Sequence, residues 1–195
     1  LQPAADEDQA PDARQPVQRE LDADREQQQQ HAHVGRGLDG GGVADEATSA
    51  AALDRIQRYQ QDFGHTFWIV ERRGDGAMLG FCGLKRVNSP GAGALEGAFE
   101  IGWRLREDAW GKGYAKEAAI ASMDLAFDRF AAPFVVALTV AGNLASQGLM
   151  KRLGMRRTPE HDFVDARFPH PGELNPSIVH RIDASEWPSA RTAAL

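Results

Sequence analysis

The pattern of hydrophobic and polar residues divides the chain into two parts near residue 48. Before that point the sequence contains no Phe, Tyr, Trp, Ile, Met or Lys. Such a segment buries little apolar surface, so we expect residues 1–47 to be low-complexity, disordered sequence. Beyond it, hydrophobic residues recur at spacings typical of helices and strands. We therefore expect one domain over residues 48–187, followed by a tail at 188–195.

Within the expected domain, the spacing predicts helices, a hairpin and several strands. One helix should begin with an N-cap at Thr48 or Ser49 and end before Gly64, and another should run from Tyr114 to Phe130, ahead of Pro133. A Gly-Asp-Gly turn at 74–76 predicts the hairpin. The remaining expected elements are strands at Thr66–Glu71, Met78–Val87, Phe99–Leu105, Phe134–Val140, Asp162–Val164 and Ser177–Ile182, and a short helix at Leu144–Leu153. This order predicts an α/β (α+β) fold with helices on the faces of a sheet, without a regular Rossmann alternation.

Charge and composition narrow the classes of function. The formal net charge is −6, and residues 1–50 hold 11 acidic and 4 basic residues against 17 and 18 in the rest. The domain is thus nearly neutral, and no nucleic-acid partner is expected. Cys82 is the only cysteine and is expected in the core, and no His or Cys spacing is typical of a metal site. With neither a secretory signal nor an apolar run of about 20 residues, we expect no membrane segment and a cytoplasmic protein.

The stretch Trp110–Ala115, which reads Trp-Gly-Lys-Gly-Tyr-Ala, lies between an expected strand and an expected helix. Gly111 and Gly113 lack a Cβ, so both adopt left-handed backbone conformations at little steric cost. Several successive N–H groups can then point into one concavity, next to the positive end of the following helix. This pattern predicts a phosphate-binding loop, and a tight strand–helix turn without a ligand is the structural alternative.

Three motifs in this order resemble the GNAT N-acetyltransferase superfamily, and within it the RimJ/RimL-like branch. They are Glu100–Leu105 (EIGWRL), Trp110–Ala115 followed by Glu117-Ala118, and Asn143 with Ser146 ahead of Lys151–Met155 (KRLGM). The resemblance covers residues 48–187. It implies a GNAT-like, mixed and mostly antiparallel sheet that is splayed between its fourth and fifth strands, with acetyl-CoA in the split. It also implies transfer of the acetyl group to a primary amine by direct attack, without an acyl-enzyme.

The resemblance also implies which residues bind acetyl-CoA. The glycine loop would hold the pyrophosphate, and the backbone after Gly102 would hold the pantetheine arm and polarise the thioester oxygen. Asn143 would cap a helix and hydrogen-bond the pantetheine. The residues implied for acetyl-CoA are Trp103, Arg104, Leu105, Trp110, Gly111, Lys112, Gly113, Tyr114, Ala115, Asn143 and Ser146.

Two residues are candidates for proton transfer. An amine with a pKa near 10 is neutral in only about one part in a thousand at pH 7, so it needs a base. Glu100 is the candidate base, unless it is simply paired with a neighbouring arginine. Ser146 is the candidate acid for the leaving thiolate, unless it is an ordinary helix-surface serine. Many family members place a Tyr one helical turn later, where this chain has Met150, which cannot donate a proton.

Three functions remain open at this point. The first is an N-acetyltransferase acting on a protein N-terminus or a small amine. A homodimer would be compatible with this function. The second is a non-catalytic CoA-binding regulatory module, which Met150 favours, and the third is nucleotide or nucleic-acid binding. The loops at 88–97 and 165–176 are expected to determine the acceptor. Residues 1–47 lack the Leu- and Arg-rich first strand of the family, so we expect an unrelated extension or an out-of-frame reading of the gene.

Overall fold

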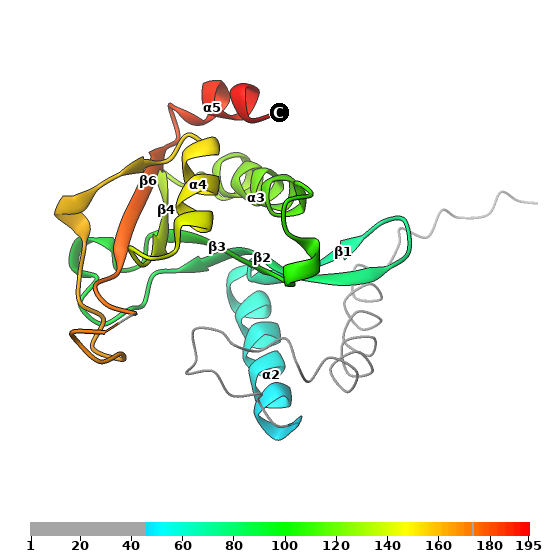
Figure 1. Cartoon of the computed structure of the whole chain (residues 1–195), viewed down its shortest axis with the longest axis horizontal. Coiled ribbons are helices and arrows are strands. Elements are labelled where there is room, and N and C mark those ends of the chain that lie inside the picture. Colours follow the sequence, from blue (N-terminus) through cyan, green and yellow to red (C-terminus); the bar gives the residue numbers. More distant parts are fainter. Residues whose placement is uncertain (1–45, 173) are drawn as a thin grey trace, which may run out of the picture.

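The computed structural model describes residues 46–172 and 174–195 (Figure 1). The expectation for residues 1–47 therefore falls almost entirely outside the described residues. The first described helix, α2 (Glu46–Phe63), begins two residues before the expected N-cap and ends before Gly64 as expected. Gly64 has a φ of 72°, which is a left-handed conformation suited to ending a helix.

A six-stranded sheet forms the centre of the domain. Its strand order is β1-β2-β3-β4-β6-β5. Every neighbouring pair is antiparallel except β3 and β4, which are parallel. The mixed, mostly antiparallel sheet is thus confirmed. The strands are β1 (Phe67–Arg72), β2 (Ala77–Arg86), β3 (Phe99–Leu105), β4 (Phe134–Thr139), β5 (Arg156–Arg157) and β6 (Ile178–Asp183).

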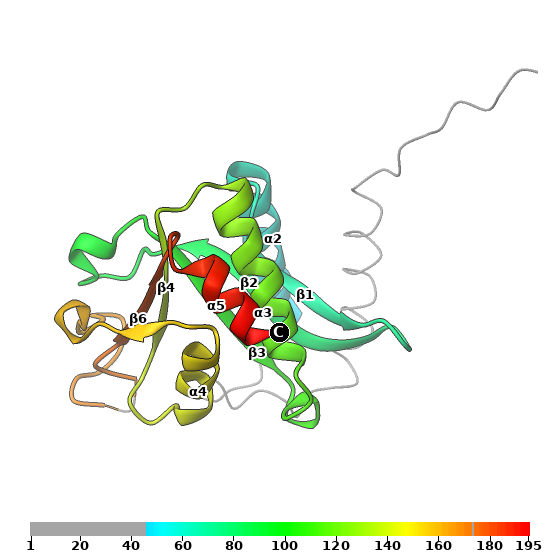
Figure 2. The same cartoon turned by 90° about the horizontal axis from the view of Figure 1, so that it is seen from above.

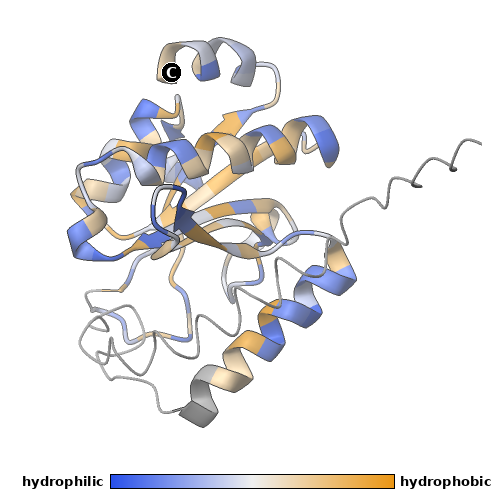
Figure 3. Cartoon of the chain, turned by 90° about the vertical axis from the view of Figure 1, so that its right-hand side faces the viewer, coloured by the Kyte–Doolittle hydropathy of each residue, from blue (hydrophilic) through white to orange (hydrophobic). Residues whose placement is uncertain are grey.

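Helices flank this sheet on both faces (Figure 1). Helices α3 (Tyr114–Asp124) and α4 (Leu144–Arg152) lie on one side, and α2 lies on the other. The expected helix Tyr114–Phe130 is α-helical only to Asp124 and continues as a five-residue π-helical turn, 125–129. Figure 3 shows apolar residues gathered in the strands between the helices, whereas polar and apolar residues alternate along α2.

The core consists of two hydrophobic clusters, one on each side of the sheet. The larger packs β2 and β3 against α3 and includes Cys82, Ile101 and Met123. Cys82 is therefore a core residue as expected, and burial raises the pKa of its thiol to about 11. The smaller cluster joins Leu95 and Val136 to the loops on the opposite face.

Two expectations near the C-terminus were wrong in part. Residues Asp162–Val164 do not form a strand, because a carboxylate oxygen of Asp162 accepts the N–H of Val179 and only Phe163 forms a bridge, to Ser177. Strand β5 was not expected, since two consecutive arginines show no alternation of polar and apolar residues.

The residues set apart as a tail belong to a helix, α5 (Trp187–Ala194), which crosses α3 (Figure 2). Trp187 is buried, and its indole N–H donates to Asp124 of α3 at 2.9 Å. Arg191 donates to the same carboxylate. The indole hydrogen bond of Trp187 and the ion pair of Arg191, both with Asp124, thus fix α5 to the domain. None of the helices within 46–172 and 174–195 has the length and apolar character that crossing a bilayer requires.

Candidate functional site

The sheet opens between β3 and β4. These parallel strands are paired only at Phe99 with Val135 and Glu100 with Val136, although β3 continues to Leu105. Beyond Glu100, the backbone of β3 is paired with β2 alone. A split is therefore present, although among the described residues it lies between the third and fourth strands rather than the expected fourth and fifth. The backbone groups on its edges are available to a ligand.

A cavity of about 760 Å³ lies where the strands part. It extends from β3 past the glycine loop and the start of α3 to the first turns of α4. Ten of the eleven residues expected to bind acetyl-CoA line it, and Lys112 alone does not. The lining residues are Trp103, Arg104, Leu105, Ala109, Trp110, Gly111, Gly113, Tyr114, Ala115, Lys116, Asn143, Ala145, Ser146, Leu149 and Arg152.

The glycine loop has the geometry of an anion cradle. Gly111 and Gly113 have φ values of 72° and 86°, and a Cβ built on either would meet no atom within 4 Å. Among the described residues, no backbone N–H from Gly111 to Lys116 has a protein acceptor. Six consecutive donors at the start of α3 therefore have no protein partner, at a helix end where the dipole also favours negative charge.

This arrangement fits acetyl-CoA better than a neutral ligand. A pyrophosphate would satisfy the unpaired N–H groups of the loop, and the amides of pantetheine would satisfy the split backbone of β3. Three cationic side chains, Arg104, Lys116 and Arg152, also line the cavity. Lys116 in addition donates to the carbonyl of Ala194 at 2.7 Å, which links α5 to the edge of the site.

Trp110 stands at the rim of the cavity with 62% of its surface exposed. Its indole N–H donates to the carbonyl of Leu105 at 2.8 Å. This bond holds the side chain of Trp110 against the last residue of β3.

Asn143 confirms its expected capping role. Its side-chain oxygen accepts the N–H of Ser146 at 3.1 Å and so caps α4. The amide nitrogen of Asn143 has no protein acceptor among the described residues, nor does the hydroxyl of Ser146 have a partner there. Both groups line the cavity and remain able to bind a ligand.

Replacing Asn143 by Ala should destabilise the protein by about 1 kcal/mol, because the N-cap of α4 is lost. For a chain of this size that corresponds to a melting temperature lower by about 2–4 °C. Asn143→Asp keeps the capping oxygen and removes only the amide donor. Thermal unfolding should therefore separate the two variants, while acetyl-CoA titration should show weaker binding for both. Equal binding by Asn143→Asp and the parent would contradict the ligand role.

Glu100 lies at the last paired position before the split, on the sheet face opposite to Trp103, because side chains alternate along β3. It is only 7% exposed. Its nearest cation is Lys85 on β2, with 3.5 Å between the ammonium and Oε1. Oε2 has no hydrogen-bond partner among the described residues. Burial raises the pKa of this carboxyl, although Lys85 opposes that effect.

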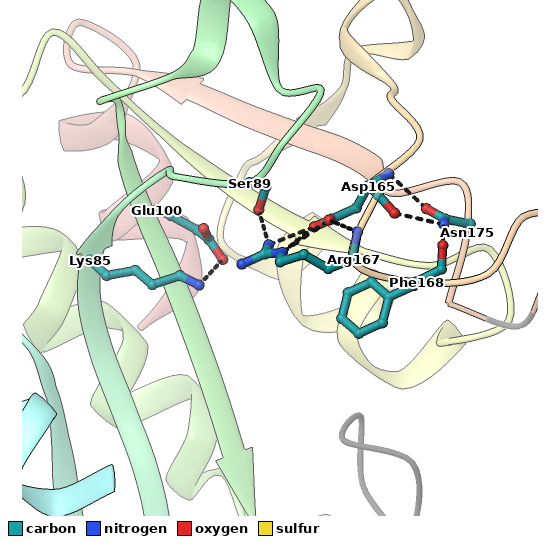
Figure 4. Close-up of polar contacts among 7 residues, drawn as sticks. All are labelled: Lys85, Ser89, Glu100, Asp165, Arg167, Phe168 and Asn175. Atoms are coloured by element: carbon teal, nitrogen blue, oxygen red, sulfur yellow. Dashed lines mark hydrogen bonds and ion pairs between the residues drawn. The ribbon is translucent and has the colours of Figure 1, made fainter. Parts of the chain in front are cut away.

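The surroundings of Glu100 come from several elements. The ring of Phe67 on β1 crosses β2 and lies against Gly102, where a Cβ would approach it to 2.9 Å. Figure 4 shows Lys85 on one side of Glu100 and the guanidinium of Arg167 on the other. The cation paired with Glu100 is Lys85 rather than a neighbouring arginine, and the role of Glu100 as a base stays a prediction.

Other residues weighed from the sequence lie outside the site. Met150, at the position where many family members have Tyr, is buried in the core. Within the described ranges no group of three or more His, Cys, Asp or Glu side chains could hold a metal. His180 is buried on β6 and burial lowers its pKa.

Besides the two cations Lys116 and Arg152, three lining residues were absent from the expected set, namely Ala109, Ala145 and Leu149. The last two could have been found, because they neighbour Ser146 on the face of a helix that begins at a known cap. Arg167 was also missed, since nothing in its local sequence indicates a position beside β3.

Comparisons with known proteins agree with this geometry. The family profile described as acetyltransferase (GNAT) domain matches residues 9–156, which is more than half of the chain and begins within the segment 1–47. The acetyltransferase from Agrobacterium tumefaciens strain C58 has a similar structure, with a TM-score of 0.60 and 24% identity over 82% of this chain and 85% of that one.

Two curated relatives are similar in sequence. YkkB from Bacillus subtilis strain 168 is 32% identical over 114 residues, which cover 58% of this chain and 64% of YkkB. The FsC-acetyl coenzyme A-N(2)-transacetylase from Aspergillus fumigatus is 32% identical over 88 residues, which cover 45% of this chain and 37% of that protein. Each match thus spans less than two thirds of the relative's length. The family match and the split-sheet cavity agree. The chain belongs to the GNAT acetyltransferase family, whose members use acetyl-CoA as a cosubstrate.

Proposed function

We propose that this protein is an acetyl-CoA-dependent N-acetyltransferase of the RimJ/RimL-like branch, acting on a primary amine. The observation that carries this proposal is the continuity of the site. Unpaired N–H groups from Gly111 to Lys116 lead into the cavity of the split sheet, and the split begins beside the buried carboxylate of Glu100. The name of the Aspergillus relative, which specifies acetyl transfer to N(2), supports nitrogen as the acceptor atom.

In this proposal the cavity positions the donor and the opposite sheet face receives the acceptor. Acetyl-CoA supplies an activated acetyl group, which an amine attacks directly. The glycine loop holds the phosphates, and the parted edge of β3 holds the arm so that the thioester lies in the split. An amine approaching from the side of Glu100 and Phe67 would meet it there.

Glu100 removes the proton that the attacking amine must lose, directly or through a water molecule. Burial raises its pKa, which makes the ionised carboxylate a stronger proton acceptor than an exposed glutamate. Lys85 opposes this effect, because its positive charge favours the ionised carboxylate. Oε2 is buried and has no hydrogen-bond partner among the described residues, so its lone pairs are free to accept that proton.

Ser146 should contribute little to the rate. A thiolate with a pKa near 8.5 leaves without strong acid assistance. Ser146→Ala should therefore lower kcat by no more than about tenfold, well below the range typical of a required acid or base. Steady-state rates across pH would measure this. A loss of about a thousandfold would instead make Ser146 the required acid.

A thiol-release assay with acetyl-CoA and a panel of amines tests the function. The panel should include short peptides with free N-termini and small primary amines. We expect amine-dependent release of CoA with at least one of them, and acetylated product by mass spectrometry. Saturable acetyl-CoA binding without turnover on any amine would favour a regulatory CoA-binding module instead.

A further inference from the structure

Arg167 joins two loops that are far apart in the sequence. Its guanidinium donates to both carboxylate oxygens of Asp165, through Nε at 3.0 Å and Nη2 at 2.5 Å. Nη2 also donates to the hydroxyl of Ser89 at 2.6 Å. The loop at 88–97 and the turn Asp165–Pro169 are thereby connected beside the end of β3 (Figure 4).

The side chain of Asn175 holds the turn that carries Arg167. Asn175 is buried, and its side-chain oxygen accepts the N–H of Asp165 at 2.9 Å. Its amide nitrogen donates to the carbonyls of Asp165 and Phe168 at 3.0 and 2.9 Å. Asp165 itself is only 2% exposed, whereas 46% of the Arg167 side chain is exposed, so only the carboxylate side of the ion pair is shielded from solvent.

This ion pair faces Glu100. Figure 4 shows the guanidinium of Arg167 between Asp165 and Glu100, with Lys85 on the far side of Glu100. Nη1 of Arg167 has no hydrogen-bond partner among the described residues, and neither has Oε2 of Glu100. No direct bond joins them, so Arg167 acts on Glu100 through its charge rather than through a contact.

The two members of the pair influence Glu100 in opposite directions. The positive charge of Arg167 lowers the pKa of Glu100, and the negative charge of Asp165 raises it. The other charged or titratable groups around Glu100 are Lys85 on β2 and Tyr59 on α2. Because Asp165 is buried, removing Arg167 alone would leave a second uncompensated negative charge near Glu100.

We propose that Arg167 is a positioning residue for the proposed base Glu100. It neutralises the charge of Asp165, and it joins the loops at Ser89 and Asp165 over the acceptor side of the split. This inference rests on the proposed function. It accounts for an ion pair between a buried aspartate and a half-exposed arginine, next to a carboxylate whose second oxygen has no partner among the described residues. It also gives the loops at 88–97 and 165–176 a shared role in the reaction.

Four variants separate charge from loop structure. Arg167→Met removes the positive charge and Asp165→Asn removes the negative charge with little change in shape. The double variant removes both, and Arg167→Lys keeps the charge without the two-pronged hydrogen bonds. The readouts are the pH dependence of kcat/KM and a carbon-13 NMR titration of the Glu100 carboxyl, whose signal is assigned by its absence in Glu100→Gln.

We expect opposite shifts from the two single variants. Arg167→Met should move the titration midpoint of Glu100 and the acid limb of kcat/KM to higher pH, so that activity falls more at acidic than at alkaline pH. Asp165→Asn should move both to lower pH. The double variant should titrate close to the parent, and Arg167→Lys should do the same.

Several outcomes would overturn the inference. One is an unchanged Glu100 midpoint in Arg167→Met. Another is a double variant shifted as far as Arg167→Met, which would mean that loop disruption, and not charge, is responsible. If Arg167→Met does not fold, an unshifted midpoint in Asp165→Asn overturns the inference by itself. The NMR titration needs no turnover, so its result stands even if no amine is acetylated and the proposed function fails.

Discussion

Replacing Gly113 by Glu should abolish acetyl-CoA binding and leave the protein folded. The φ of Gly113 is 86°, and its missing Cβ points into open space at the start of α3. A carboxylate placed there would enter the anion cradle and accept hydrogen bonds from the N–H groups that would otherwise bind the pyrophosphate. It would also repel the negative charge of the pyrophosphate. The same carboxylate would favour the helix N-terminus and partly offset the backbone strain. We expect the dissociation constant to rise at least about a hundredfold, the equivalent of 2.7 kcal/mol.

Gly97→Glu is the matched control for this variant. Gly97 has a φ of 78°, and a Cβ there would also meet nothing within 4 Å, but the residue does not line the cavity. Both substitutions therefore carry the same backbone strain and the same added charge. Calorimetric titration should show parent-like acetyl-CoA binding for Gly97→Glu only. Equal weakening by both variants would show that the effect is general strain.

Glu100→Gln should lower kcat by about 10²–10⁴-fold, which is the range associated with losing a general base. The amide is nearly the same shape but cannot accept the proton of the amine. Acetyl-CoA binding should be unchanged, because Glu100 does not line the donor cavity. The control is Glu160→Gln, which changes an exposed carboxylate within Pro159–His161, outside both loops, and should retain full activity.

The same variant should be more stable than the parent at pH 8. Burial raises the pKa of Glu100 in the folded state, so its protonated form is favoured on folding. That contribution is present below the ordinary pKa of a glutamate and is lost as pH rises through the raised value. Gln carries no charge at any pH. The melting temperature of Glu100→Gln should thus exceed that of the parent at pH 8, and the gap should shrink toward pH 5. A lower melting temperature at pH 8 would contradict the account of Glu100 as a carboxylate under desolvation.

Local sequence patterns predicted those parts of the fold that rest on local physics. Strand β3 was predicted at both ends, because Phe99–Leu105 alternates in a way that suits a sheet with one covered face. The start of α3 after Gly113 and the end of α2 before Gly64 also follow from single residues with left-handed backbone conformations. The donor cavity was predicted nearly completely for the same reason, since its residues belong to three short motifs.

The rest depends on contacts between distant segments, which no local pattern records. The burial of Glu100 arises from Phe67, Lys85 and the turn near Arg167, which come from three different regions of the chain. Helix α5 is held by Asp124, more than sixty residues away in sequence. The contacts on the acceptor side of the site were therefore the part that the sequence predicted least.

Calorimetric titration of the full chain tests most directly whether the cavity between β3 and β4 binds acetyl-CoA. Acetyl-CoA should bind saturably with one site per chain, CoA should compete for that site, and ATP at the same concentration should produce no comparable heat. Absence of any acetyl-CoA binding, or equally strong binding of ATP, would contradict the assignment of the glycine loop and the split sheet to this donor.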